Sequence, residues 1–589
     1  MNFDTNYGMK ALRHLNKYFL KYWKKLLIGL LITVSARVFS LVMPSYINKS
    51  IQTIEQFFKG NIDKTQAQEL LAIDIGIIIG TTVIAALLTF LMRQYIINVS
   101  RYIEFDLKNE LFEHYLSLSL NFFKRNRVGD LMNRLSEDVS QVRMYAGPAI
   151  MYGLQTLTLF VILIPLMFIK APTLALYTVL PFPILSVLIY NISKRIHLRS
   201  TAVQAYLSTL STFTQERFSG IAVVKAYGLE EQIDQEISQL SSEGKETAMH
   251  LARINAWFFP LMLLLIGASN IIVMFVGGRM FLNGSISSVG LIAEFILYVN
   301  MLTWPVTVVG WLTSIIQRAE ASQERINDFL KTAPDLVSGD LPVENVKGEL
   351  SFKNVHLTYQ DTNIEALKGI SFTVKPGETL AILGKTGSGK SSVMDLSARL
   401  LDPTSGTILL DQKDIKSYHL DKLRAEIGTV PQDAFLFSET IKSNIKFGSK
   451  DADDDTIINA AKMADVHDNI LSFPDGYDTL LGERGISLSG GQKQRVSIAR
   501  ALIKQAKIYL FDDCLSAVDT ETEEVILENI KKLTIDKTTL IVSHRISTVK
   551  HANRIIVIED GRITQEGTHA ELLEKEGFYK HLYHEQLVA

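Results

Sequence analysis

The 589-residue sequence contains a single cysteine, Cys514. One thiol excludes an internal disulfide framework, a four-thiolate zinc site and a catalytic domain that requires a second cysteine. An excess of one charge is also lacking, because 60 lysines and arginines balance 62 aspartates and glutamates and leave a net charge of −2. Without the basic excess typical of nucleic-acid-binding proteins, no nucleic-acid partner is expected.

Apolar residues are abundant, at 47% of the chain against 21% charged residues. Up to about Ser314, apolar runs of about 20 residues recur, which is the length a helix needs to cross the hydrocarbon core of a membrane. None resembles a cleaved signal, because the first run is too long and lacks a small-residue cleavage site. The runs predict six membrane-spanning helices, at residues 26–46, 70–92, 149–169, 172–192, 255–277 and 291–316.

Basic residues predict the orientation of these spans. Six precede the first span and five follow the second: Lys10, Arg13, Lys17, Lys21, Lys24 and Lys25, then Arg101, Lys124, Arg125, Arg127 and Arg134. Such segments lie on the cytoplasmic side of a cell membrane. With an even number of spans, both termini are expected to be cytoplasmic. The long polar segments 93–148 and 193–254 are helical in pattern, so the membrane helices are expected to extend into the cytoplasm.

The apolar runs stop after Gln317, and the Pro- and Gly-bearing stretch TAPDLVSGDLPVENVKG indicates a linker. Beyond it, short β-rich runs alternate with helical patterns, which predicts an α/β domain with a largely parallel sheet. The predicted organisation is a cytoplasmic N-terminal helix at 1–25, a helical transmembrane domain at 26–316, a linker at 317–348 and an α/β domain at 349–589.

Two motifs in the α/β domain indicate a phosphate-binding site. GKTGSGKS follows the apolar strand TLAIL and precedes a helix, the context that a P-loop requires. Its backbone amides can bind phosphates, Lys390 can neutralise the β and γ oxygens, and the Ser391 hydroxyl can bind Mg²⁺. The strand IYLFD ends in Asp512, which is placed to hold the magnesium through water. The predicted P-loop residues are Gly384, Lys385, Thr386, Gly387, Ser388, Gly389, Lys390, Ser391 and Ser392.

A third motif, LSGGQ, precedes the helical pattern KQRVSIARAL. Its residues Ser489, Gly490, Gly491 and Gln492 can form a second anion-binding surface at a helix N-terminus. With these three motifs and six spans, nearly the whole chain resembles an ABC transporter half-molecule of the exporter type. The resemblance implies that two nucleotide domains face each other head to tail. Each ATP then lies between one chain's P-loop and the other chain's LSGGQ, so a lone chain would be inactive.

The resemblance implies roles for further residues. Tyr359 lies where the family stacks adenine on an aromatic ring, although a tyrosine at a strand end is more often plain packing. Gln432 resembles the glutamine that senses magnesium and contacts the membrane domain, and His544 resembles the switch histidine at the γ-phosphate. SAVD, Ser516–Asp519, resembles the loop that couples the two ATP sites.

Other matches concern contacts with the membrane helices. Glu483 and Arg484, in LGERG, resemble an exporter-specific stretch that touches the membrane helices of the opposite half. Segments 122–139 and 213–231 resemble the cytoplasmic loops whose short helices dock on the nucleotide domains. Charge runs of this kind are otherwise solvated helix faces.

Asp513 follows the magnesium aspartate, where family members with fast sites carry a glutamate that polarises the attacking water. Asp is one methylene shorter, so this chain's own site is expected to bind ATP and hydrolyse it slowly. The intact LSGGQ serves the opposite site. This combination resembles the Asp-bearing subunit of asymmetric exporters, which predicts a heterodimer, while a slow homodimer with two Asp sites stays open.

Arg37 lies within the first span, where a charged group is costly and usually has a function. It is expected either to pair with Asp74 or Glu294 of other helices or to contact substrate. Leu297, Trp304 and Trp311 recur every seven residues on the sixth span. They could line an apolar cavity, and Trp311 could instead belong to the aromatic belt at the membrane interface.

The sequence therefore predicts a dimeric, ATP- and Mg²⁺-dependent exporter of a hydrophobic or amphiphilic compound, such as a drug-like molecule or a lipid. One alternative is an ATP-gated or regulatory membrane subunit that binds nucleotide and hardly hydrolyses it. A soluble DNA-repair or translation ATPase would have a similar nucleotide domain, but it conflicts with the six spans.

Overall fold

The computed structural model describes residues 10–343, 346–482, 485 and 488–588, except for the side chains at 184–186, 189, 190, 193, 197, 258, 259, 265, 306, 307 and 588. The chain divides into two compact units. The helical unit contains the chain up to Leu116 and Gly129–Thr332, and the α/β unit contains Ser117–Val128 and the chain from Ala333 onward. The short segment Ser117–Val128 thus belongs to the α/β unit, although helices of the other unit flank it.

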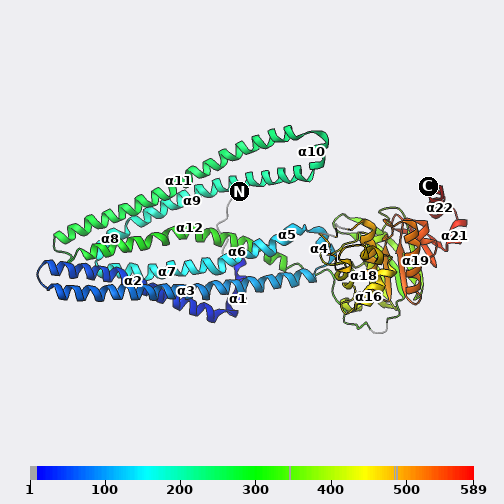
Figure 1. Ribbon diagram of the computed structural model, residues 1–589, viewed down its shortest axis with the longest axis horizontal. Coiled ribbons are helices and arrows are strands. Elements are labelled where there is room, and N and C mark those ends of the chain that lie inside the picture. The colour runs from blue at the N-terminus through cyan, green and yellow to red at the C-terminus, as the bar shows by residue number, and fades with distance from the viewer. Residues whose placement is uncertain (1–9, 344–345, 483–484, 486–487, 589) are drawn as a thin grey trace. The chain divides into compact units, whose positions relative to one another are not determined.

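The helical unit is built from long helices (Figure 1). At a rise of 1.5 Å per residue, the 54 residues of α3 span about 80 Å, far more than the roughly 30 Å of a hydrocarbon core. Helix α3 is therefore longer than a membrane span requires, while the extension of these helices into the cytoplasm stays a prediction. The elements are η1 (Ala11–Leu15), α1 (Asn16–Lys21), α2 (Trp23–Phe58), α3 (Lys64–Ser117), α5 (Val128–Asn133), η2 (Arg134–Asp138), α6 (Val139–Met144), η3 (Tyr145–Ala149), α7 (Ile150–Lys170), α8 (Pro172–Val179), α9 (Pro181–Ser219), α10 (Ile221–Tyr227), α11 (Glu230–Leu282) and α12 (Gly290–Leu330).

Five helical segments among the described residues are long and apolar enough to cross a membrane. They are Trp23–Phe58, Lys64–Ser117, Val128–Lys170, Glu230–Leu282 and Gly290–Leu330. The predicted fourth span, 172–192, is divided in the structure between α8 and α9, which meet at Leu180. Pro181 and Pro183 follow this residue, and proline removes the backbone donor that a continuous helix requires.

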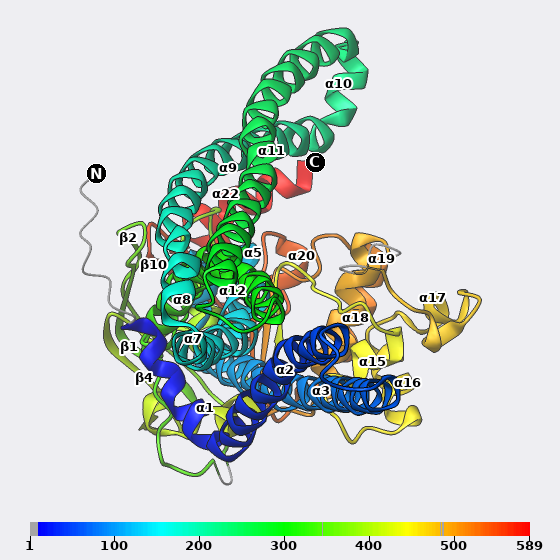
Figure 2. The ribbon, with the colours of Figure 1, turned by 90° about the vertical axis from the view of Figure 1, so that its left-hand side faces the viewer.

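The helical unit has a packed core toward one end of its bundle. Leu163 and Met167 of α7 and Phe295 and Tyr298 of α12 are buried together with Val273 of α11. Helices α9 and α11 run side by side as far as α10, which both ribbon views show (Figures 1 and 2). Helix α12 contacts α2, α7 and α11 and therefore lies at the centre of their packing.

The polar groups inside the bundle are paired differently from the sequence prediction. Arg37 donates to the amide oxygen of Gln155 at 2.9 Å. Asp74 pairs with Lys49 at 3.3 Å. Glu294, which is fully buried, pairs with Lys170. The ion pair predicted between Arg37 and Asp74 or Glu294 is therefore not formed, because both carboxylates already have a lysine partner.

The α/β unit contains two sheets. The first has six strands in the order β10-β9-β3-β8-β7-β6, and all of them except β10 run parallel. The second has four antiparallel strands in the order β2-β1-β4-β5. The strands are β1 (Leu350–Tyr359), β2 (Ile364–Val374), β3 (Thr379–Leu383), β4 (Ser405–Leu410), β5 (Lys413–Asp414), β6 (Ile427–Val430), β7 (Ile508–Asp512), β8 (Thr538–Val542), β9 (Arg554–Glu559) and β10 (Arg562–Gly567).

Helices cover these sheets and bury near-continuous apolar strands such as β7 and β8, as expected for parallel strands buried on both faces. The helices of the α/β unit are α4 (Leu120–Arg125), α13 (Lys390–Ser397), η4 (Ile415–Ser417), α14 (Leu420–Ala425), α15 (Ile441–Lys446), α16 (Asp454–Met463), α17 (His467–Leu471), η5 (Gly476–Asp478), α18 (Gly490–Leu502), α19 (Thr520–Leu533), α20 (Ile546–Val549), α21 (His569–Glu574) and α22 (Phe578–Val588). Helix α12 continues to Leu330, so the part of the predicted linker up to this residue is helical and belongs to the helical unit.

The register of the parallel strands brings distant sequence motifs to one edge. Asp512 of β7 lies opposite Val542 of β8, and Val542 lies opposite Ile382 of β3. The P-loop follows the end of β3, Asp513 follows the end of β7, and His544 lies two residues after the end of β8. All three therefore lie at the carboxyl ends of neighbouring parallel strands. Ligands of open α/β sheets bind at the carboxyl ends of the strands, so this edge is the candidate site.

Candidate nucleotide-binding site

The P-loop connects β3 to α13 through a turn that needs glycine. Gly389 has φ +101°, and a Cβ there would lie 2.4 Å from the carbonyl oxygen of Ala366. Only glycine fits such a left-handed position with a backbone so close. The turn brings Lys390 to the start of α13, where its Nζ donates to the carbonyls of Gly384 at 2.9 Å and Lys385 at 2.8 Å.

The charges around the P-loop fit a magnesium nucleotide. The Ser388 hydroxyl and Asp512 Oδ1 are buried and have no hydrogen-bonding partner among the described residues. Burial raises the pKa of Asp512, and the Ser391 hydroxyl and Lys390 ammonium oppose this rise. A buried donor beside the glycine turn and a buried carboxylate oxygen are what a phosphate and a hydrated cation would satisfy.

The described residues contain no cluster of three or more His, Cys, Asp or Glu side chains that could hold a metal ion. Mg²⁺ is generally held by one or two protein oxygens together with substrate phosphates and waters, so such a cluster is not needed here. Ser391 and Asp512 would hold the ion, and the role of Gln432 at the metal stays a prediction. When bound, Mg²⁺ would supply charge neutralisation at the phosphates.

Hydrogen bonds hold both the backbone amide and the backbone carbonyl of Asp513. Its amide donates to the carbonyl of Val542 at 2.9 Å, and its carbonyl accepts from the Ser516 hydroxyl at 2.9 Å. Its φ is +45°, a left-handed conformation that Asp and Asn adopt more readily than most residues. The reach of the Asp513 carboxylate is therefore set by the length of its side chain.

The remaining predicted contacts lie around this edge. Burial and the Lys390 charge lower the pKa of His544, and Asp513 opposes this, so the histidine lies within electrostatic reach of both groups. Gln432 is exposed and follows β6, the parallel neighbour of β7. Tyr359 ends β1, and its phenol shares a hydrogen bond of 2.9 Å with the Ser392 hydroxyl of α13. Thr386 and Gly387 lie in the exposed part of the loop.

The LSGGQ residues form a separate surface at the start of α18. Ser489 is the N-cap, and with Gln492 it makes a reciprocal capping box. A Cβ on Gly491 would lie 2.8 Å from the carbonyl oxygen of Ala517, so glycine permits close contact with the SAVD loop. Among the described residues, no hydrogen bond or ion pair joins Ser489, Gly490, Gly491 or Gln492 to the P-loop. Glu483 and Arg484 lie outside the described residues.

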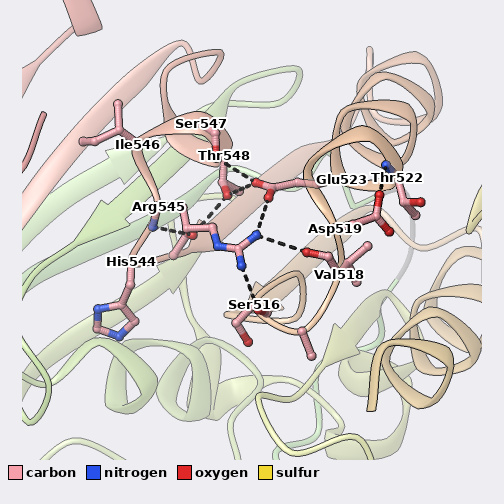
Figure 3. Close-up of polar contacts among 12 residues, drawn as sticks. Ser516, Val518, Asp519, Thr522, Glu523, His544, Arg545, Ile546, Ser547 and Thr548 are labelled. Carbon is pink, nitrogen blue, oxygen red and sulfur yellow. Dashed lines mark hydrogen bonds and ion pairs between the residues drawn. The ribbon is translucent and has the colours of Figure 1, made fainter. Parts of the chain in front are cut away.

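Two positioning contacts were missed by the sequence prediction. Arg545, directly after His544, donates to the carbonyls of Ser516 and Val518 and to the carboxylate of Glu523 (Figure 3). In the α/β unit's segment Ser117–Val128, Lys124 Nζ lies 3.5 Å from Asp395 of α13. The sequence signal for the first contact was the arginine that directly follows Ser543 and His544. The second contact had no sequence signal, because Lys124 and Asp395 are brought together only by the fold.

Comparison with known proteins places this fold and site in a family. Residues 26–306 match the model of the "ABC transporter transmembrane region", and residues 367–516 match that of the "ABC transporter". The chain belongs to the ABC transporters, as an exporter half-molecule with a helical transmembrane domain followed by the nucleotide-binding domain. It is an ATPase coupled to transmembrane transport and a multi-pass membrane protein.

Individual relatives match along nearly the whole chain. "Uncharacterized ABC transporter ATP-binding protein YknU" of Bacillus subtilis is 37% identical, over 98% of this chain and 97% of the relative. "Multidrug resistance-like ATP-binding protein MdlA" of Escherichia coli is 34% identical, with the same coverage. A solved structure, described as that of a bacterial Atm1-family ABC exporter with ATP bound, is 25% identical with a TM-score of 0.79 over 96% of this chain and 99% of the other.

Proposed function

We propose that the chain is one half of a dimeric exporter that moves a hydrophobic or amphiphilic compound out across the cytoplasmic membrane. The observation that carries this proposal is the separation of the two nucleotide-binding surfaces within one chain. The P-loop, Asp512 and His544 meet at one sheet edge, while Ser489 caps a different helix beside the SAVD loop. A second chain is needed to complete each ATP site.

The residues have distinct roles in this proposal. Lys390 neutralises the phosphates, Ser391 and Asp512 hold Mg²⁺, and Tyr359 stacks on the adenine. Gln432 and His544 sense the metal and the γ-phosphate, and Asp513 orients the attacking water. Closure of the two nucleotide domains then favours an outward-open membrane domain, and hydrolysis resets it. The termini lie in the cytoplasm in this arrangement, in keeping with the basic residues near the first two spans.

The names of the relatives support the substrate class. MdlA is described as multidrug resistance-like, and a Staphylococcus aureus relative 36% identical is described as a putative multidrug export protein. Apolar side chains exposed on α3, among them Ile79, Val83, Leu87 and Phe90, suit a substrate that enters from the lipid phase.

Transport into inverted vesicles tests the proposal. Vesicles that contain the chain should take up hydrophobic dyes against a gradient when ATP is present, and the matched Lys390→Ala vesicles should not. Dye flux only down a gradient would instead support the ATP-gated alternative. Native mass measurement of the purified complex tests the dimer, because one or two kinds of chain give different masses.

A further inference from the structure

A cavity of about 400 Å³ lies in the helical unit between α2, α3 and α7. Its volume is within the range of small-molecule sites. Its polar lining consists of Thr33, Arg37 and Ser40 of α2, Thr82 and Thr89 of α3, and Gln155 of α7, with alanines between them. Thr82 and Thr89 are exposed, so the cavity opens at the surface of α3.

Arg37 is the charged group of this cavity. It lies 11 residues after the start of the apolar run at Leu26, or about 17 Å along the helix, which is near the middle of a hydrocarbon core about 30 Å thick. A cation at this depth is costly and is normally paired. Among the described residues, Arg37 forms no ion pair, since Asp74 and Glu294 are taken by Lys49 and Lys170.

The other polar groups of the cavity hold the guanidinium without neutralising it. Gln155 accepts one hydrogen bond from Arg37 at 2.9 Å and turns its own amide toward the Met92 sulfur. The hydroxyls of Thr33 and Thr89 donate to carbonyls of their own helices. The guanidinium has five N–H donors, and Gln155 takes one of them, so an oxyanion could accept from those that remain.

We propose that the Arg37 cavity binds the anionic headgroup of an amphiphile, whose apolar tail extends along the exposed surface of α3. The inference deepens the proposed export function, on which it rests, by assigning amphiphilic anions as the preferred substrate class. The headgroup could belong to a membrane lipid or to an exported solute, since both offer the same oxyanion.

A matched pair of fluorescent probes tests this site in the intact chain. The chain is placed in nanodiscs of phosphatidylcholine and titrated with dansyl-undecanoate and with its methyl ester, which lacks the charge. The acid should bind about tenfold more tightly than the ester, as expected for a charge-assisted hydrogen bond of about 1.4 kcal/mol. Arg37→Gln should abolish this preference, and Arg37→Lys should keep part of it.

Arg253→Gln is the matched control, because it removes an arginine from α11 of the same unit outside the cavity. It should leave the preference unchanged. Equal binding of acid and ester by the original chain, or an unchanged preference in Arg37→Gln, would overturn the inference. Thermal unfolding of each variant separates a folding defect from lost binding, and Arg37→Lys keeps the test valid if Arg37→Gln does not fold.

Two further arms identify the source of the headgroup and separate this inference from the export proposal. Competition by phosphatidylglycerol but not by a free carboxylate solute assigns the cavity to a lipid, and the opposite result assigns it to a solute. If vesicles export neutral dyes while Arg37→Gln leaves the acid preference intact, this inference fails and export stands. If Arg37-dependent binding occurs without ATP-driven uptake, the site stands and export fails.

Discussion

The guanidinium of Arg545 lies 2.8 Å from the carboxylate of Glu523, which is 1% exposed. The same guanidinium donates to the carbonyls of Ser516 at 2.9 Å and Val518 at 3.2 Å. One side chain thus joins the loop after His544 to the SAVD loop and to α19. Through this contact, a shift of His544 would change the position of the loop beside the LSGGQ surface.

Replacing Arg545 tests this connection. Arg545→Ala leaves the buried Glu523 carboxylate with the hydroxyls of Ser547 and Thr548 alone, so it should destabilise the α/β unit by about 1–3 kcal/mol. ATPase activity should fall several-fold at saturating ATP while the KM for ATP changes little, because the P-loop is untouched. Arg545→Lys should rescue only in part, since an ammonium cannot match the planar fork that reaches three acceptors.

An exposed ion pair provides the control for this measurement. Lys532 lies 2.8 Å from Glu528 on α19, and both side chains are about two-thirds exposed. Lys532→Ala should therefore change stability by less than about 0.5 kcal/mol and leave activity unchanged. A KM effect in Arg545→Ala as large as the effect on turnover would show that Arg545 acts on nucleotide binding instead.

Lys124 connects the segment Ser117–Val128 to the P-loop helix. Burial raises the pKa of Asp395 on α13, and Lys124 opposes this rise from 3.5 Å away. Its ammonium also lies 5.9 Å from the centre of the Tyr359 ring, the proposed adenine platform. Lys124→Ala should reduce the stimulation of ATPase activity by transported dyes and leave the basal rate within about twofold, because an exposed pair contributes only about 0.2–1 kcal/mol.

A second cation in the same segment supplies the control. Arg127 is exposed, and among the described residues it makes no ion pair, so Arg127→Ala should leave dye stimulation unchanged. The double variant Lys124→Ala with Asp395→Asn should resemble the single variants if the two side chains act as a pair. Additive losses would show that Lys124 and Asp395 act separately.

The motifs that depend on local sequence were predictable. Apolar runs of sufficient length produce membrane helices in any context, and glycine-rich turns after a buried strand fix the P-loop around Lys390. Partners across helices were not predictable, because the pairing of Arg37 with Gln155 depends on the relative register of α2 and α7. The break at Leu180 had a local signal in Pro181 and Pro183, which a hydropathy average over 172–192 conceals.

Cys514 should be inert in the folded chain. Its side chain is 2% exposed, and burial raises the pKa of its thiol well above the ordinary value. Since the thiolate is the reactive form, maleimide labelling should be at least about 100-fold slower than in detergent-denatured chain. An added thiol at an exposed site, Lys531→Cys, should label readily under native conditions. Rapid native labelling of Cys514 would mean that the loop after β7 opens in solution.

Lengthening the side chain of Asp513 by one methylene should distinguish a homodimer from a heterodimer. Its backbone is fixed by Val542 and Ser516, so Asp513→Glu advances the carboxylate by about 1 Å without moving the loop. Since φ is +45° and Glu tolerates this conformation less well than Asp, a stability cost of up to about 1 kcal/mol is expected. Loss of a general base typically lowers a rate by roughly 10²–10⁴. A carboxylate that reaches the attacking water could therefore raise the rate of ATP hydrolysis substantially.

The outcome depends on the partner. In a homodimer, Asp513→Glu corrects both sites and should raise the ATPase rate of the purified complex severalfold. In a heterodimer whose other site already dominates, the rate should change little, and native mass should show two kinds of chain. Asp513→Asn is the control, because it keeps the size of the side chain and removes the charge, and it should not raise the rate in either assembly. A loss of activity in Asp513→Glu would contradict the geometric argument in both cases, because the pocket would then be built around the shorter carboxylate.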